Sequence, residues 1–170
     1  RDRYWYNLGE TLVALGHFRA AAETLEKSTL HHADHAESWA KLGQAYRRLD
    51  RHEDALKAYD RALSINEHYA WAWNGRGVAL EALSRREEAF ASYERALNED
   101  QSVIWYHINL VDLLLDMGKK KDALAVIDQA TVALPNNAIG WARRGQVQRR
   151  LGDHRAAVES YQRAVEIEPM

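Results

Sequence analysis

The strongest constraint on this chain is a period of 34 residues that runs through its whole length. Identical or similar residues recur at that spacing in five separate columns. The columns are Trp5, Trp39, Trp73, His107 and Trp141; Gly9, Gly43, Gly77, Val111 and Gly145; Leu15, Leu49, Leu83, Met117 and Leu151; Ala21, Ala55, Ala89, Ala123 and Ala157; and Ser28, Ala62, Ala96, Ala130 and Ala164. A fixed period of this length is typical of repeat proteins, in which one supersecondary unit is stacked many times.

Each unit carries two stripes of apolar residues at helical spacing. In residues 36–69 the first stripe runs from Trp39 to Leu49, and the second runs from Ala55 to Leu63. Glycine and alanine at fixed columns let helix axes approach closely, while the large aromatic residues fill the space beside them. The pattern therefore predicts two helices in every unit, and each pair must stack on its neighbours because it is too small to bury its own apolar face.

Glycine and proline mark the ends of these helices. Gly16, Gly118 and Gly152 lie in the turn between the two helices, where we expect a left-handed residue to end the first helix. Pro135 and Pro169 lie where one unit passes to the next, and proline cannot continue a helix there. The predicted repeats are residues 2–35, 36–69, 70–103, 104–137 and 138–170, as a single array over 1–170.

The repeat resembles the tetratricopeptide repeat, which carries Trp, Leu, Gly, an aromatic residue, Ala, an aromatic residue, Ala and Pro in that order. The unit that resembles it most contains Trp39, Leu42, Gly43, Tyr46, Ala55, Tyr59 and Ala62. The resemblance covers essentially the whole chain and implies an all-α fold. The implied architecture is an α-solenoid in which five antiparallel helix pairs stack into a right-handed superhelix, with the first helix of each pair on the concave side.

Composition excludes several other classes of function. The chain has 23 basic and 25 acidic residues and a net charge of −2, so no overall charge attracts nucleic acid or an anionic membrane. It has no cysteine, which removes disulfides, zinc–thiolate sites and cysteine nucleophiles. No apolar stretch reaches the roughly 18 residues of a membrane-spanning helix. We expect neither a nucleic-acid nor a membrane partner, and a cytoplasmic location.

Catalytic and metal-binding groups are not predicted. His31, His32 and His35 form one ligand-rich cluster, but it falls between two units, where we expect a solvated turn rather than a metal site. Gly75 and Gly77 lie inside a helical pattern and form no phosphate-binding loop. Because no nucleophile, base and orienting group come together, we expect no enzyme activity, cofactor or metal.

The resemblance places a set of first-helix residues on the concave wall. The predicted protein- or peptide-binding residues are Tyr6, Asn7, Lys41, Gln44, Arg47, Trp71, Asn74, Trp105, Asn109, Asp112, Arg143 and Gln146. Trp71 and Trp105 lie two residues before the framework column, which turns them away from the buried stripe. Exposed tryptophans are typical of binding hot spots. The alternative is that they fill the gap between neighbouring first helices.

Two features of the wall concern the partner's chemistry. Arginines at both ends would suit a carboxylate or phosphate, although cations near helix ends are also favoured without a ligand. The wall lacks the full set of Lys, Asn and Arg residues with which some relatives bind chaperone C-termini. Asn7 and Asn109 are similar to the asparagines that grip a peptide backbone in O-linked N-acetylglucosamine transferases. We therefore expect a protein or extended peptide as partner, with an acidic one as an alternative.

Two further hypotheses remain open at this point. The chain begins at Arg1 without an initiator methionine, and the last helix would leave Val158, Tyr161 and Val165 uncovered. We expect an excerpt of a longer protein, and the alternative is a homo-oligomer formed through this end. The array could also be the sensor or substrate-recruiting arm of a larger enzyme.

Overall fold

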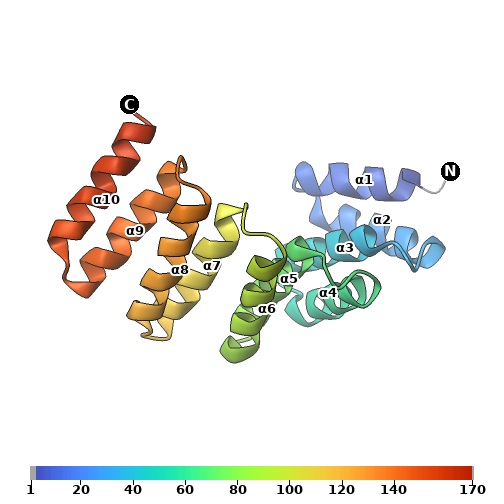
Figure 1. Ribbon diagram of the computed structural model, residues 1–170. Coiled ribbons are helices and arrows are strands. Elements are labelled where there is room, and N and C mark those ends of the chain that lie inside the picture. Colours follow the sequence, from blue (N-terminus) through green and yellow to red (C-terminus); the bar gives the residue numbers. More distant parts are fainter. Residues whose placement is uncertain (1–2, 170) are drawn as a thin grey trace. The chain divides into compact units, whose positions relative to one another are not determined.

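The computed structural model describes residues 3–169, which form ten α-helices and no strand. In chain order, the helices are α1 (Arg3–Ala14), α2 (Phe18–His31), α3 (Ala36–Arg48), α4 (His52–Ile65), α5 (Ala70–Ala82), α6 (Arg86–Glu99), α7 (Ile104–Asp116), α8 (Lys120–Ala133), α9 (Ala138–Leu151) and α10 (His154–Ile167). Each predicted repeat contains one antiparallel pair (Figure 1). The predicted array also includes Arg1, Asp2 and Met170, which lie outside the described residues.

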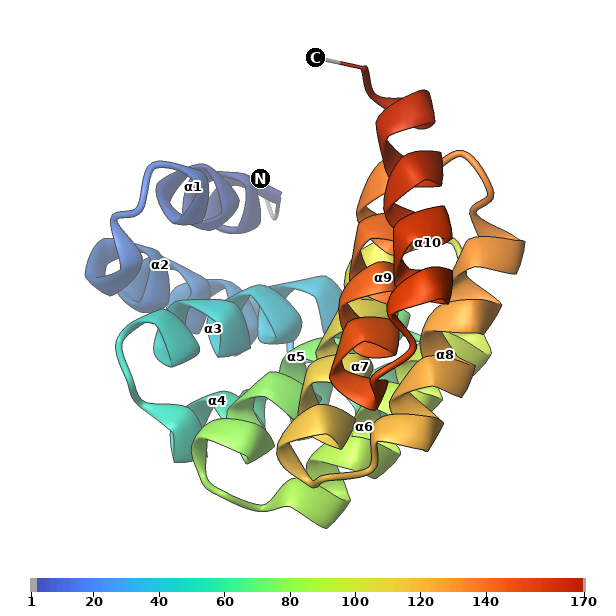
Figure 2. The same ribbon diagram turned by 90° about the vertical axis from the view of Figure 1, so that its left-hand side faces the viewer.

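The helices form two compact units, which we call unit 1 (α1–α6) and unit 2 (α7–α10). In unit 1, α2 packs on α3 and α4 packs on α5, while the first helices α1, α3 and α5 contact one another in series (Figure 2). In unit 2, α8 packs on α9 and α7 contacts α9. The predicted stacking of helix pairs is thus present within each unit. That all the repeats form a single domain stays a prediction.

The glycine column is explained by a large side chain that faces it. A Cβ atom built on Gly77 would lie 2.5 Å from the ring of Tyr93, which is almost fully buried. Similar close approaches pair Gly9 with Leu25, Gly43 with Tyr59 and Gly145 with Tyr161. In the fourth repeat, Val111 takes the glycine position, and the smaller Ile127 takes the tyrosine position. Both residues are fully buried, so the two columns compensate each other in size.

The turn between the helices of a pair uses a left-handed residue in every repeat. The φ angles of Gly16, Gly118 and Gly152 are 77°, 75° and 87°, which confirms the prediction. Asp50 and Ser84 occupy the same place in the second and third repeats, with φ of 58° and 59°. A side chain with a Cβ is strained in this region, although aspartate tolerates it better than most residues.

In the second, third and fifth repeats, the tryptophan of the column ties the first helix to the preceding turn. The indole N–H donates to the carbonyl six residues earlier, in Trp39 to Ala33 (3.0 Å), Trp73 to Glu67 (2.7 Å) and Trp141 to Pro135 (2.9 Å). His107, which replaces tryptophan in the fourth repeat, makes the same contact from Nε2 to the Gln101 carbonyl at 3.1 Å. Burial lowers the pKa of His107, although the bond to Gln101 opposes this shift. The neutral imidazole therefore fits the site.

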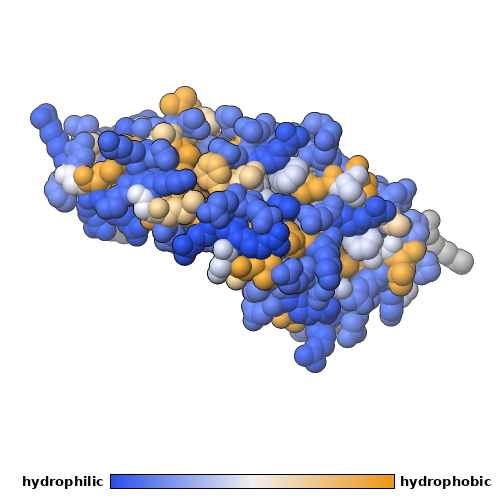
Figure 3. Space-filling model, turned by 90° about the horizontal axis from the view of Figure 1, so that it is seen from below, coloured by the Kyte–Doolittle hydropathy of each residue, from blue (hydrophilic) through white to orange (hydrophobic). Residues whose placement is uncertain are grey.

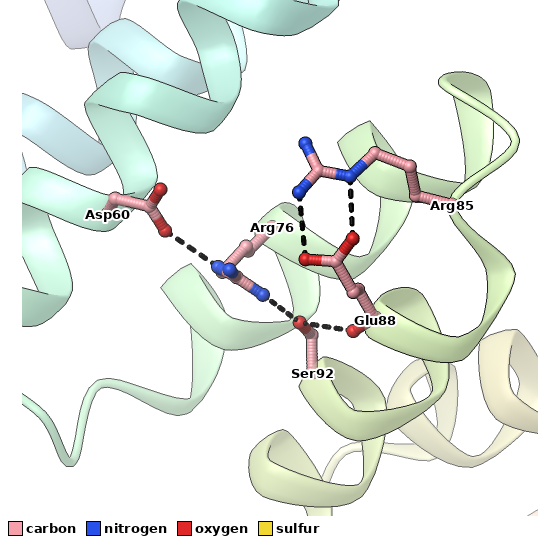
Figure 4. A network of polar contacts seen from close by, with 5 residues as sticks. All are labelled: Asp60, Arg76, Arg85, Glu88 and Ser92. Atoms are coloured by element: carbon pink, nitrogen blue, oxygen red, sulfur yellow. Dashed lines mark hydrogen bonds and ion pairs between the residues drawn. The ribbon is translucent and has the colours of Figure 1, made fainter.

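A second polar contact links the second and third repeats. Arg76 on α5 approaches Asp60 on α4 at 2.7 Å and donates to Ser92 Oγ on α6 at 2.7 Å (Figure 4). The equivalent residues in unit 2 are Arg144, Asp128 (2.6 Å) and Ser160 (2.9 Å). The family pattern has leucine at the position of Arg76, as Leu42 shows in the second repeat. The arginine thus connects three helices that leucine would join by apolar contact alone.

No helix within residues 3–169 is both long enough and apolar enough to cross a membrane.

Candidate functional site

The wall of unit 1 is formed by the first helices α1, α3 and α5. Lys41 on α3 lies at its centre, with Nζ 3.2 Å from Glu10 Oε1 on α1 and 5.0 Å from the ring centroid of Trp71 on α5. The Tyr6 hydroxyl also donates to Glu10 Oε1, at 3.4 Å. We call Tyr6, Glu10, Lys41 and Trp71 the Lys41 cluster. Three successive first helices therefore contribute to one continuous set of contacts.

The Lys41 cluster is partly open to solvent. The side chains of Lys41 and Glu10 are 21% and 47% exposed. Trp71 is half-buried, because its ring contacts Tyr59 at 6.4 Å and Tyr69 at 6.0 Å between centroids. Trp71 thus packs on the core and also presents a face to Lys41, and its role in binding stays a prediction.

Gly75 interrupts the wall next to Trp71. A Cβ atom on Gly75 would lie 2.5 Å from the ring of Tyr59, so no side chain fits there. Burial raises the pKa of the Tyr59 hydroxyl to about 12, and the nearby Arg47 opposes the shift. Two predicted wall atoms of α3 are buried without a hydrogen-bond partner among residues 3–169: Gln44 Oε1 and Arg47 Nε. These two atoms are therefore closed to solvent, whereas the Lys41 side chain is partly exposed.

A cavity of about 210 Å³ adjoins the cluster at Tyr6. It is lined by Arg3, Tyr6, Ser28, His32, Asp34 and His35. Two of the three histidines for which the sequence predicted a solvated turn thus line a cavity. The rings of His35 and Tyr6 meet edge to face at 5.0 Å.

His35 also belongs to a chain of polar contacts that reaches Ser28. Its Nδ1 accepts from the Ser38 backbone N–H and lies 2.7 Å from Ser38 Oγ, and Ser38 Oγ lies 2.9 Å from Ser28 Oγ. Because Ser38 is fully buried, these contacts cap α3 rather than present a nucleophile. No group of three or more His, Asp or Glu side chains is placed to hold a metal within the described part of the chain.

The wall of unit 2 combines an exposed apolar pair with a polar network. Trp105 on α7 and Ile139 on α9 occupy equivalent positions and are 56% and 43% exposed. Arg143 donates to Asp112 Oδ2 at 2.8 Å and to Gln146 Oε1 at 2.6 Å. Burial raises the pKa of Asp112, although Arg143 opposes the shift. The predicted basic character of this end is thus partly neutralised, because the Arg143 guanidinium already binds two internal acceptors.

The structure brings together some of the predicted wall residues and leaves others apart. In unit 1, Lys41 contacts Trp71, and both Lys41 and Tyr6 contact Glu10. In unit 2, Arg143 contacts both Asp112 and Gln146. Asn7 is exposed, and Asn74 and Asn109 are half-buried. Trp71 and Trp105 belong to different units, so a single site that contains both stays a prediction. Ile139 was not among the predicted residues, although the 34-residue spacing from Trp105 identifies its position.

On the face drawn in Figure 3, apolar residues form small patches separated by hydrophilic ones. Contacts that combine aromatic and charged groups, as in the Lys41 cluster, suit such a surface better than a purely apolar interface does.

Comparison with known proteins places the chain in a family. One model of the tetratricopeptide repeat matches residues 6–70 and 108–169, and a second model of the same repeat matches residues 72–102. A comparison with curated protein sequences gave no match.

Several solved structures share the fold at low sequence identity. PilF from Pseudomonas aeruginosa has a TM-score of 0.84 at 18% identity, over 99% of this chain and 77% of that one. MamA from Desulfovibrio magneticus RS-1 has a TM-score of 0.80 at 17% identity, over 98% of this chain and 94% of that one. YrrB, described as a TPR protein with an unusual peptide-binding site, has a TM-score of 0.71 at 18% identity, over 97% of this chain and 85% of that one.

These similarities confirm the predicted all-α solenoid of antiparallel helix pairs. The matched repeat models together cover most of the sequence and agree with the helix pairs that the structure shows. The chain therefore belongs to the tetratricopeptide repeat family.

Proposed function

We propose that this protein is a non-catalytic scaffold that binds an extended peptide segment of a partner protein on the first-helix wall of unit 1. The observation that carries the proposal is the Lys41 cluster, in which residues from α1, α3 and α5 form one partly exposed aromatic and charged surface. Aromatic residues with adjacent polar groups are typical of the few side chains that supply most of the binding energy of an interface.

The neighbouring cavity supports a peptide rather than a small metabolite as the ligand. It is small, at about 210 Å³, and it adjoins the exposed wall at Tyr6. A single side chain of an extended segment fits such a cavity, while the rest of the segment follows the wall toward Trp71. The similarity in fold to YrrB and the membership of the repeat family support the same class of ligand.

A selection experiment tests the proposal. Peptides are selected from a random library on the purified protein, and the Kd of one of them is measured by fluorescence anisotropy. We expect Trp71→Ala to weaken binding by about tenfold or more, as loss of a hot-spot aromatic does. A matched control is Leu30→Ala, which removes an exposed apolar side chain from α2 in the same unit.

Lys41→Ala separates lost contacts from lost folding. It removes a partly exposed side chain, so the protein should keep its helical circular dichroism spectrum and still bind the peptide less tightly. If both wall variants bind as the wild type does, the wall of unit 1 is not the binding surface.

A second candidate function is self-association through α10. Val165 is 65% exposed, whereas Leu63 and Thr131, at the same repeat position, are 7% and 6% exposed. Sedimentation velocity over a range of concentrations tests this candidate. The candidate would be supported if the wild type forms an oligomer and the double variant Val158→Glu with Val165→Glu does not. A monomer at every concentration would exclude it for this chain.

A further inference from the structure

We infer that the wall of unit 1 selects a segment with an acidic side chain, and that Glu10 is a built-in competitor for that acid. The inference rests on the proposed peptide-binding function and specifies the partner's chemistry. Its basis is the position of Lys41, whose Nζ is held between the Glu10 carboxylate at 3.2 Å and the Trp71 ring at 5.0 Å.

The Glu10 carboxylate shows where a partner's carboxylate would lie. It approaches Lys41 from α1, on the partly exposed side of the wall. An ammonium group has three donors and no acceptor, so its natural ligand at this place is an anion. The face of Trp71 holds the ammonium in position by a cation–π contact, so Lys41 stays on the wall when its carboxylate partner changes.

Glu10 has an alternative donor when it leaves Lys41. The Tyr6 hydroxyl donates to the same Oε1 atom at 3.4 Å, and the half-exposed Glu10 side chain also reaches water. Exchange of one carboxylate for another on Lys41 therefore leaves no buried charge without a partner. A partly exposed ion pair contributes little, so the exchange costs little.

The other carboxylates of this wall already have partners. Glu81 on α5 accepts from the Tyr93 hydroxyl at 2.9 Å, and Glu37 on α3 lies 3.4 Å from His35 Nε2. A partner's carboxylate can therefore replace that of Glu10 on Lys41 without altering the contacts of Glu81 or Glu37. A segment that places aspartate or glutamate on Lys41 and an apolar group against Trp71 fits this arrangement.

A comparison of two selections tests the acid preference. A random peptide library is selected in parallel on the wild type and on Lys41→Glu. We expect aspartate and glutamate to be enriched at one position on the wild type, and lysine or arginine at that position on the variant. Peptides of the same composition from both proteins would overturn this inference alone. Failure of the wild type to select any peptide would instead contradict the proposed binding function.

The role of Glu10 is tested with one selected acidic peptide and its amide counterpart, in which the selected Asp is Asn or the selected Glu is Gln. Glu10→Gln keeps the size of the side chain and removes the competing charge. We expect Glu10→Gln to lower the Kd of the acidic peptide about three- to fivefold, which is the size of a weak ion pair. The Kd of the amide peptide should stay unchanged. Lys57→Ala, on α4 of the same unit, is the charge control and should change neither Kd. Weaker binding of the acidic peptide to Glu10→Gln would overturn the competitor role.

Discussion

Replacing Gly77 by valine should destabilise the third repeat, because the structure leaves no room for a side chain there. A Cβ atom at this position would lie 2.5 Å from Cε1 and 2.6 Å from Cδ1 of Tyr93. The tyrosine ring has little freedom to move away, since it is buried and its hydroxyl donates to Glu81 at 2.9 Å. The fourth repeat shows the compensated arrangement, with Val111 and Ile127 at the same two positions.

The size of the effect follows from the packing. Extra methyl groups in a close-packed core cost about 1–3 kcal/mol. The better helix propensity of valine over glycine offsets only a few tenths of this. Tyr93→Ile alone should cost about 2–3 kcal/mol, because it leaves unfilled space and removes the bond to Glu81. The double variant Gly77→Val with Tyr93→Ile recreates the fourth-repeat pair. It should be more stable than the sum of the single changes predicts, by about 1–2 kcal/mol.

Urea unfolding of the four proteins, followed by far-UV circular dichroism, gives the free energies of this double-mutant cycle. A favourable coupling energy between the two changes would confirm that the glycine and tyrosine columns compensate in volume. If the two changes add to within about 0.5 kcal/mol, the proposed contact does not determine the glycine column.

Three further predictions concern single residues. The lowered pKa of His107 means that the unfolded chain takes up the proton first. The contribution of His107 to the free energy of unfolding is therefore fully present above the ordinary pKa of 6.5, and it falls as the pH drops below that value. The loss should be smaller in His107→Gln, as measured by urea unfolding between pH 7 and about pH 5, and an equal loss in both proteins would contradict it. Ser84→Gly should stabilise the fold by about 1 kcal/mol, since φ there is 59°, and Asp50→Gly by less. Thermal unfolding measures both, with Gly118→Ala as the reverse control, and unchanged melting temperatures would show that these turns are unstrained. Arg76→Leu should change the free energy of unfolding by less than about 1 kcal/mol, because the Arg76 and Asp60 side chains are 20% and 52% exposed. A loss above about 2 kcal/mol in urea unfolding would show that the buried Ser92 needs the arginine.

The helices and their turns could be predicted from the sequence because each depends on residues that are near one another in the chain. The 34-residue columns gave the helix pairs and the glycine turns at Gly16, Gly118 and Gly152. The left-handed residues Asp50 and Ser84 were missed, because neither is a glycine. Their spacing from Gly16 was present in the sequence and would have identified both.

The candidate site was predicted less completely, because its contacts join side chains of different repeats. The resemblance placed Lys41 and Trp71 on the same wall, but it did not show that Lys41 lies between Trp71 and Glu10. That arrangement depends on side-chain conformations and on the spacing of α1, α3 and α5. The cavity beside Tyr6 was unexpected for the same reason, since it requires the end of α2 and the start of α1 to be placed together.

The most direct test of the proposed wall is a titration of the tryptophan indole N–H signals by two-dimensional ¹H–¹⁵N NMR with a selected peptide. Trp73 and Trp141 serve as internal references, because their indole N–H groups donate to backbone carbonyls outside the cavity lining. Binding on the wall of unit 1 predicts that the Trp71 signal shifts with the peptide concentration while the two reference signals stay in place. A saturating peptide that leaves Trp71 unshifted would contradict the proposal that this wall binds the partner.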